Sequence, residues 1–303
     1  MFFFNKKHTI AASGILQGAT DHHSHILPGV DDGVETIAEA LHILATYESL
    51  GIKELWLTPH IMEDIPNSPA KLQARFEELK AAYTGNITLH LAAEYMIDNH
   101  LRKVLEGTNS PSREYPQEEG DEIKKLRPAT EGRWHEQSDV TEGSETTNEK
   151  LRHSSIGEVV EDRRGEKKTK ECPKLLPIGT TGKHILVETS YYNAPMRFND
   201  TLQQIKSLGY FPLLAHPERY MYLDNAEYIK LHSEGVKFQL NLVSLAGGYG
   251  KAVQKKALWL LNNGLYSVAG SDLHCEDAIE YITKCKLSDK EVEQVKALLQ
   301  NVL

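Results

Sequence analysis

The stretch TDHHSHILPGVDDG, residues 20–33, places three histidines and three aspartates within one short segment. Such side chains do not suit a hydrophobic core, because an unpaired polar or charged group is costly to bury. His23 and His25 are two residues apart, so in a strand both side chains point to the same face, where they can share a metal ion. Asp32 follows in a glycine-flanked turn that can return its carboxylate to the same place. The segment therefore predicts a strand and a turn that begin a metal site, which later segments must complete.

Short apolar segments that end in polar side chains recur along the rest of the chain. They predict strands at KELWLTPH (53–60), ITLHLAAEY (87–95, ending at Glu94), HILVETS (184–190, ending at Glu188), FPLLAHPERY (211–220, ending at His216), KFQLNLVSL (237–245) and YSVAGSDLH (266–274, ending at Asp272 and His274). Apolar residues three and four apart predict helices at residues 34–51, 68–83, 201–210, 226–235, 251–264 and 288–303. Strands that alternate with helices favour a parallel sheet closed into a barrel. We therefore predict an α/β fold, a distorted seven-stranded (β/α)7 barrel of the TIM type, as a single domain over residues 1–303.

Residues 108–174 do not follow this alternation. They are rich in charged residues and poor in large apolar ones, a composition typical of disorder. A structureless connection of this length is unusual inside a compact domain. We interpret residues 108–174 as a charged, low-complexity insertion that loops out of the barrel, rather than as a second domain. Trp134, His135 and His153 fall within it and are expected to be solvated loop residues.

The overall composition argues against several classes of protein. A net charge of −9 and a pI of about 5.9 disfavour a nucleic-acid-binding protein, which needs a basic face. The three cysteines, Cys172, Cys275 and Cys285, have no C-x-x-C spacing and are too few for a disulfide framework, which favours a reducing, cytoplasmic location. No segment approaches the roughly 18 consecutive apolar residues of a membrane helix, so no membrane span is expected.

Nearly every residue able to bind a metal lies at the carboxyl end of a predicted strand, where barrel enzymes assemble their active sites. Imidazole suits zinc, iron and manganese, whereas carboxylates favour harder ions, so the mixed set indicates Mn²⁺, Fe, Zn²⁺ or Mg²⁺. The set exceeds the needs of one ion, and bridging carboxylates would hold two or three ions within about 4 Å of one another. Asp21 suits a role in orienting a histidine, and Asp31 suits either that role or a turn. The nine candidate ligands are His23, His25, Asp32, His60, Glu94, Glu188, His216, Asp272 and His274.

The chain resembles the PHP (polymerase and histidinol phosphatase) superfamily, in which the motifs DHHSH, DDG, TPH, AAEY, LVETS, AHPERY and GSDLH occur in this order. Within it, the chain is most similar to the bacterial protein-tyrosine phosphatases of capsule and exopolysaccharide systems. The most specific motifs are HSHILPGVDDG and AHPERY, and the resemblance runs from Thr20 to Ala278 with the insertion as an interruption.

This resemblance implies a cluster of three metal ions, usually manganese or iron, with Glu94 as a bridge between the first two. It also implies that Arg219 contacts the phosphate group, so Arg219 and His216 are the expected catalytic residues. A second arginine that some members carry after SDLH is absent from CEDAIEYITK. The implied ligand sets are His23, His25, Glu94 and Asp272 for the first ion, Glu94, Glu188 and His216 for the second, and Asp32, His60 and His274 for the third.

The resemblance implies hydrolysis of phosphotyrosine on a protein by a metal-activated hydroxide, with a membrane-associated tyrosine kinase of capsule or exopolysaccharide synthesis as the substrate. The residues leave open a phosphatase for a small metabolite such as histidinol phosphate, because both reactions need the same metals. They also leave open a non-catalytic, metal-dependent module that docks on a kinase tail through the insertion. The acidic balance and the absence of a polymerase region disfavour a polymerase-linked exonuclease. Cys275 lacks the phosphate-cradling loop of a cysteine phosphatase.

Overall fold

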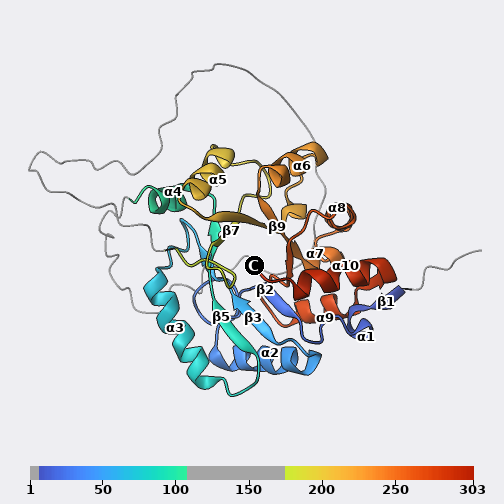
Figure 1. The fold of residues 1–303 in the computed structure, drawn as a ribbon. Helices are drawn as coiled ribbons and strands as arrows, with labels where there is room; N and C mark the ends of the chain where they lie inside the picture. Colours follow the sequence, from blue (N-terminus) through green and yellow to red (C-terminus); the bar gives the residue numbers. More distant parts are fainter. Residues whose placement is uncertain (1–6, 108–174) are drawn as a thin grey trace, which may run out of the picture. The chain divides into compact units, whose positions relative to one another are not determined.

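The computed structural model describes residues 7–107 and 175–303, which belong to one compact unit (Figure 1). The interpretation of residues 108–174 as an insertion, together with Trp134, His135, His153 and Cys172, lies outside the described residues. Short strands alternate with helices along the described chain. The strands are β1 (Lys7–Thr9), β2 (Thr20–Ser24), β3 (Glu54–Leu57), β4 (His60–Ile61), β5 (Thr88–Leu91), β6 (Glu94–Met96), β7 (His184–Glu188), β8 (Phe211–Ala215), β9 (Lys237–Asn241), β10 (Val268–Gly270) and β11 (Lys286–Ser288).

Helices occupy most connections between the strands, and the apolar spacing predicts most of these helices. They are α1 (Ile10–Ser13), α2 (Ile37–Leu50), α3 (Pro69–Ala82), α4 (Asn99–Leu105), α5 (Phe198–Ser207), α6 (Asn225–Ser233), α7 (Leu242–Ala246), α8 (Lys251–Asn262), α9 (Asp277–Lys284) and α10 (Asp289–Gln300), with a 3₁₀ helix, η2, at Pro217–Arg219. Among the described residues, none of these helices has the length and apolar character needed to cross a bilayer.

Parallel pairing organises the strands into two sheets. One sheet has the order β10-β9-β8-β7-β6-β4 and the other has the order β2-β3-β5, whereas β1 and β11 form a separate antiparallel pair. Along the chain, β3 is followed closely by β4, and β5 by β6, so consecutive pieces of extended chain belong to different sheets. A bridge between Ser24 and Leu273 and a hydrogen bond from His25 N to Leu273 O (2.9 Å) join the end of β2 to the segment after β10. The predicted α/β class with parallel strands is confirmed.

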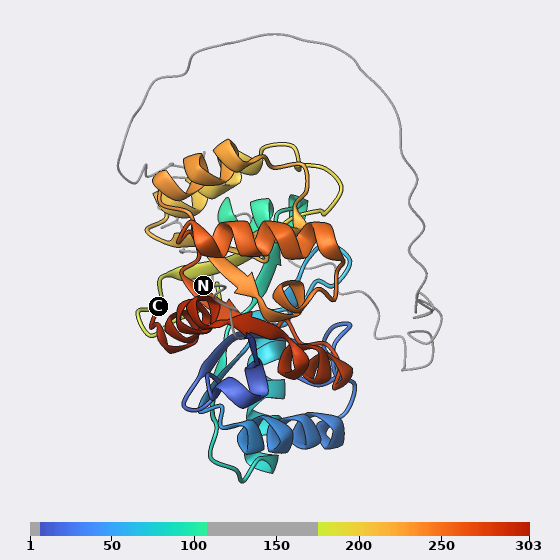
Figure 2. The ribbon, with the colours of Figure 1, turned by 90° about the vertical axis from the view of Figure 1, so that its right-hand side faces the viewer.

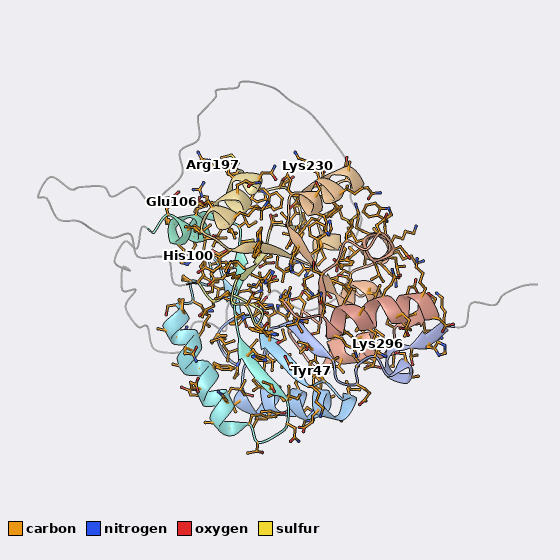
Figure 3. The ribbon with its side chains drawn as sticks, viewed as in Figure 1. Tyr47, His100, Glu106, Arg197, Lys230 and Lys296 are labelled. Atoms are coloured by element: carbon orange, nitrogen blue, oxygen red, sulfur yellow. The ribbon has the colours of Figure 1, made fainter. Side chains whose placement is uncertain are left out.

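Both faces of the central strands are buried, as is usual in parallel sheets. Along β7, Ile185 and Val187 belong to the main hydrophobic core, whereas Leu186 belongs to a second, smaller cluster with Leu213 and Val268. Helices cover the sheets on opposite sides, with α2 in blue and α6 in orange far apart in Figure 2. The charged side chains labelled in Figure 3 lie at the periphery, whereas Tyr47 is buried beside the sheet.

Local capping explains where several helices begin. Thr36 and Ser288 each form a capping box with the glutamate three residues later, and Ser68 caps α3 with Pro69 at its first position. The prediction that a strand covers residues 237–245 is wrong in its second half. The strand ends at Asn241, whose Oδ1 accepts hydrogen bonds from Val243 N (2.7 Å) and Ser244 N (3.1 Å) and so starts the short helix α7.

Candidate metal centre

The carboxyl ends of the parallel strands bring the nine candidate ligands into one region. Seven of them are buried, and only Asp32 and His274 reach the surface to any extent. Donor atoms of eight of them, all except His216, form three overlapping groups, and within each group the atoms lie within 4.8 Å of one another. This arrangement follows from topology, because neighbouring parallel strands end at the same edge of a sheet. The groups are His23, His25, Glu94 and Asp272; His60, Glu94 and Glu188; and His25, Asp32, His60 and His274.

The first group is the most deeply buried. His23 Nε2 lies 3.2 Å from Glu94 Oε2 and 3.4 Å from Asp272 Oδ1. His25 Nε2 lies 3.3 Å from the same Glu94 oxygen and 3.4 Å from the same Asp272 oxygen. Two imidazole nitrogens and two carboxylate oxygens therefore face a common point, with the residues that the resemblance assigns to the first ion.

The second group contains His60, where the resemblance implies His216. His60 Nδ1 lies 3.1 Å from Glu188 Oε1 and 3.2 Å from Glu94 Oε2. These three atoms are buried and make no hydrogen bond to any described residue. Because leaving buried polar atoms unpaired is costly, their convergence fits a seat for a cation. His216 lies beside this group, with Nε2 at 3.0 Å from the other oxygen of Glu94 and 3.8 Å from Glu188 Oε2.

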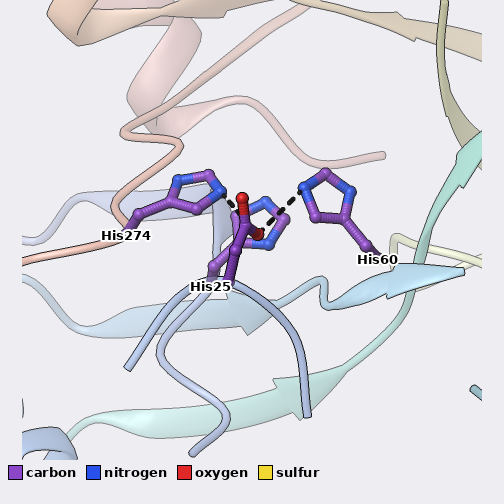
Figure 4. A group of neighbouring side chains, drawn as sticks. His25, His60 and His274 are labelled. Atoms are coloured by element: carbon purple, nitrogen blue, oxygen red, sulfur yellow. Dashed lines mark ion pairs between the residues drawn. The ribbon is translucent and has the colours of Figure 1, made fainter. Parts of the chain in front are cut away.

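The third group lies toward the surface. His60 Nε2 and His274 Nε2 are each 3.5 Å from Asp32 Oδ1, and the rings of His25 and His274 stack with their centroids 4.0 Å apart. Figure 4 shows these three imidazoles directed toward one another, with the two ion pairs dashed. The exposed Asp32 carboxylate therefore marks the mouth of the cluster.

A second layer of hydrogen bonds orients the imidazoles of the cluster. His23 Nδ1 lies 2.9 Å from Gln239 Oε1, His25 Nδ1 lies 2.8 Å from Asp31 Oδ2, and His274 Nδ1 lies 2.9 Å from the Asp272 carbonyl. An acceptor at Nδ1 fixes the proton there and leaves Nε2 with a lone pair for a metal. Asp31 also accepts hydrogen bonds from His60 N at 3.0 Å and from Gly33 N at 3.1 Å, so it contacts an imidazole and also closes the turn.

Two other residues near the cluster differ from what the sequence indicated. Asp21 contacts no imidazole; it accepts hydrogen bonds from His23 N (3.1 Å), Ser271 N (2.8 Å) and Tyr47 Oη (3.1 Å), and so holds the backbones that carry ligands. Gln239 was not identified from the sequence. Its only signal there is a polar residue between the apolar residues Phe238 and Leu240.

The electrostatics of the cluster favour bound positive charge. Burial raises the pKa values of the Glu94 and Asp272 carboxyls, but the neighbouring imidazoles, His23 above all, outweigh it and hold both well below the usual range. Burial and the adjacent His25 lower the pKa of His60, but Glu188 and Glu94 outweigh them and raise it to about 9. The carboxylates favour the protonated form of the neighbouring histidines. A metal cation that binds here takes the place of those protons.

Backbone strain is also located at this cluster. Among the described residues, only Arg197, His216 and Asp272 are non-glycine residues with positive φ. His216, at φ 33°, directly follows β8, and Asp272, at φ 53°, lies two residues after the end of β10. Residues held in this sparsely populated region cluster at functional sites, where the surrounding structure compensates for the strain.

The 3₁₀ helix η2 places an arginine beside the cluster. Arg219 donates a hydrogen bond from Nη1 to Asp272 Oδ2 at 3.1 Å, and Asp272 Oδ1 is one of the atoms of the first group. Asn241 Nδ2 donates to the same Asp272 Oδ2 at 2.8 Å. A single carboxylate thus connects a guanidinium to the candidate metal site.

Comparison with known proteins agrees with this geometry. The chain resembles the putative tyrosine-protein phosphatase CapC of Staphylococcus aureus, with 22% identity over 288 residues that cover 93% of this chain and 88% of that protein. It also resembles the tyrosine-protein phosphatase YwqE of Bacillus subtilis, with 24% identity over 258 residues that cover 84% and 76%. Among solved structures, those of YwqE from Bacillus subtilis and CpsB from Streptococcus pneumoniae, described as metal-dependent tyrosine phosphatases, share the fold with a TM-score of 0.59, 20% identity, and coverage of 93% of this chain and 94% of theirs.

A family profile also matches most of the chain. Residues 19–112 and 132–294 match the family described as capsular polysaccharide synthesis, CpsB/CapC. The matched ranges contain all nine candidate ligands and Arg219. The resemblance to the phosphatases of capsule systems is therefore confirmed, and the chain belongs to the CpsB/CapC family of capsular polysaccharide synthesis.

Proposed function

We propose that the chain is a metal-dependent protein-tyrosine phosphatase. The observation that carries the proposal is the sharing of Glu94 between two of the three groups, with Arg219 tied to Asp272 at their edge. Clustered divalent cations beside an arginine form a site suited to a phosphoryl group. The names of the relatives, both tyrosine-protein phosphatases, support the same reaction class.

The eight residues of the three groups, together with His216, would hold two or three ions. Their mixed nitrogen and oxygen donors suit manganese, iron, zinc or magnesium, with manganese as our first choice. When bound, such ions supply a nucleophilic hydroxide near neutral pH and positive charge next to the phosphate. Glu94 would bridge two of them, because its Oε2 faces both His23 and His60 at 3.2 Å.

The protein's own groups would bind and orient the substrate. Arg219 would donate hydrogen bonds to the phosphate oxygens and stabilise their charge as the bond to the tyrosyl oxygen breaks. The leaving group is a phenolate, whose conjugate acid has a pKa of about 10, so it needs little help from a general acid. His216, held between Glu94 and Tyr220, would complete the site: its Nδ1 lies 3.3 Å from the Tyr220 hydroxyl.

The proposal includes the substrate, the location and the closure of the fold. We propose a phosphotyrosine-bearing protein as substrate, in particular a membrane-associated kinase of capsule synthesis, and action in the cytoplasm. The close succession of β3 and β4, and of β5 and β6, supports counting each pair as one interrupted strand of a seven-stranded barrel. The bridge between Ser24 and Leu273 supports closure of that barrel. The single domain with an insertion at 108–174 stays part of this proposal.

Activity measurements on the metal-loaded full chain test the proposal. We expect turnover of a phosphotyrosyl peptide to exceed that of histidinol phosphate, and His216→Ala and Arg219→Ala to lose about 100-fold or more in kcat/KM. The exposed residues His232 and Lys230 supply matched controls, and His232→Ala and Lys230→Ala should behave as wild type. Wild-type turnover by both site variants would overturn the mechanism. Faster turnover of histidinol phosphate than of the phosphotyrosyl peptide would show that the substrate is a small metabolite and not a protein.

A further inference from the structure

Two tyrosine rings enclose the guanidinium of Arg219. Its Cζ atom lies 4.0 Å from the ring centroid of Tyr191 and 4.1 Å from that of Tyr249. Both distances are well inside the roughly 6 Å limit of a cation–π contact, and a planar guanidinium stacks readily on aromatic faces. Tyr191 lies in the segment after β7, whereas Tyr249 lies between α7 and α8, so two distant segments converge on one cation.

A third contact fixes the end of the same side chain. Among the described residues, the hydrogen bond from Arg219 Nη1 to Asp272 Oδ2 is the only one that the Arg219 side chain makes. A guanidinium has five N–H donors in a fixed fork, so most of them stay available for a second, planar acceptor such as phosphate. The Arg219 side chain is 17% exposed, so these donors are within reach of a ligand at the cluster.

Each tyrosine is itself held in place. Tyr191 donates a hydrogen bond from its hydroxyl to Glu188 Oε2 at 3.3 Å. Its ring stacks on that of Tyr220, with the two ring centroids 6.1 Å apart. Tyr249 lies in a tight turn closed by a hydrogen bond from Gly250 N to Gly247 O at 3.0 Å. Both glycines have φ near 90°, a conformation that side chains with a Cβ rarely adopt, so the turn that presents Tyr249 depends on them.

We infer that Tyr191 and Tyr249 form a clamp that holds the Arg219 guanidinium in the orientation that receives a phosphate group at the edge of the metal cluster. The inference deepens the proposed function and rests on it. Both tyrosines are positioning residues, because they act through Arg219. The ring faces supply the effect, so phenylalanine should replace either tyrosine in this role and alanine should not.

Binding of inorganic phosphate to the manganese-loaded full chain, measured by isothermal titration calorimetry, tests the clamp without turnover. We expect Tyr191→Ala and Tyr249→Ala each to weaken phosphate binding about tenfold, and Tyr191→Phe and Tyr249→Phe to stay within about twofold of wild type. Tyr192, which is 80% exposed and next in sequence to Tyr191, provides the matched control, so Tyr192→Ala should bind phosphate as wild type. Manganese content, measured on the same samples, should not change.

A double-mutant cycle separates positioning from a general structural role. In an Arg219→Ala background, either alanine substitution should cause no further loss, because the clamp has nothing left to hold. Wild-type phosphate affinity in both alanine variants overturns the inference, as do additive losses in the cycle. Losses in the phenylalanine variants equal to those in the alanine variants also overturn it, because they would assign the effect to the hydroxyls. If Tyr191→Ala does not fold, Tyr249→Ala decides alone.

The same experiment keeps the two proposals apart. A wild-type chain that binds phosphate but hydrolyses no phosphotyrosyl peptide would contradict the proposed function, and the clamp would still be decided by the binding data. A chain that hydrolyses the peptide with unchanged phosphate binding in both alanine variants would support the function and contradict the clamp.

Discussion

Gln239 Oε1 lies 2.9 Å from His23 Nδ1, although the two residues are 216 positions apart in the sequence. The same oxygen accepts a hydrogen bond from His216 N at 3.2 Å. One buried glutamine on β9 therefore orients an imidazole at the end of β2 and the backbone of a second candidate ligand after β8. Groups of this kind tune a metal site without touching the metal.

Removing this acceptor should weaken metal binding. We expect Gln239→Leu, which keeps a similar volume, to reduce manganese affinity by about 10–100-fold, because His23 loses the partner that fixes its tautomer. Gln203 is exposed on α5, so Gln203→Leu is the control. Manganese titration of both variants gives the answer, and equal affinities would show that Gln239 has no orienting role.

The overlap of the three groups predicts a hierarchy among the ligands. Glu94 belongs to two groups and is fully buried, whereas Asp32 belongs to one and is exposed. Glu94→Gln should therefore release more metal per chain than Asp32→Asn and should lower phosphatase activity further. Elemental analysis of the purified variants measures the metal content. Equal losses in the two variants would contradict a shared Glu94.

Removal of the metals should destabilise the fold. The site gathers buried carboxylates and imidazoles, and a ligand that binds only the folded state stabilises it by about 2.7 kcal/mol at 100 times its Kd. Chelation with EDTA should lower Tm in thermal unfolding, and manganese should restore it. In Glu94→Gln the Tm should respond much less to either treatment. An equal response in that variant would place the stabilising metal elsewhere.

His184 should make stability depend on pH outside the metal site. Its side chain is buried on β7, neither ring nitrogen has a hydrogen-bond partner among the described residues, and burial lowers its pKa from 6.5 to about 4. The unfolded chain therefore binds a proton that the folded chain does not between these values. The stability that neutral His184 contributes is fully present above pH 6.5. As pH falls toward 4, the free energy of unfolding should decrease by roughly 2 kcal/mol.

Replacement of the imidazole tests this contribution. Denaturant unfolding of His184→Phe should show a smaller loss of stability between pH 6.5 and 4 than that of the wild type. His232→Phe, at an exposed position, should leave the pH dependence as it is. Parallel curves for wild type and His184→Phe would show that His184 titrates normally in the folded protein.

Glu218 should support the turn that carries Arg219. It is fully buried and accepts hydrogen bonds from Asn241 N at 3.0 Å and from Tyr266 Oη at 2.8 Å. Glu218→Ala would leave both donors unpaired, which should lower the free energy of unfolding by about 2–4 kcal/mol. The exposed Glu227 only caps the start of α6, so Glu227→Ala should lower the free energy of unfolding by about 1 kcal/mol or less. Comparable losses in the two variants would show that the buried hydrogen bonds of Glu218 stabilise the fold no more than an exposed helix cap does.

Local sequence patterns predict much of the fold. The apolar spacing predicts most of the helices, and Ser68 and Ser288 begin α3 and α10 as their positions indicate, because capping involves residues only a few positions apart. The short apolar run LVSL after Asn241 fits either a strand or a helix, so its apolar pattern alone does not decide the structure. There the side chain of Asn241 decides the outcome by capping α7.

The sequence by itself determined the α/β class and the nine candidate ligands, because metal-capable side chains after apolar strands must meet at one edge of a parallel sheet. Only the tertiary structure decided how those ligands divide into groups and which residues support them. Gln239, Tyr191 and Tyr249 contact residues from other strands and turns. Such contacts depend on how the whole chain packs, and no spacing within one segment encodes them.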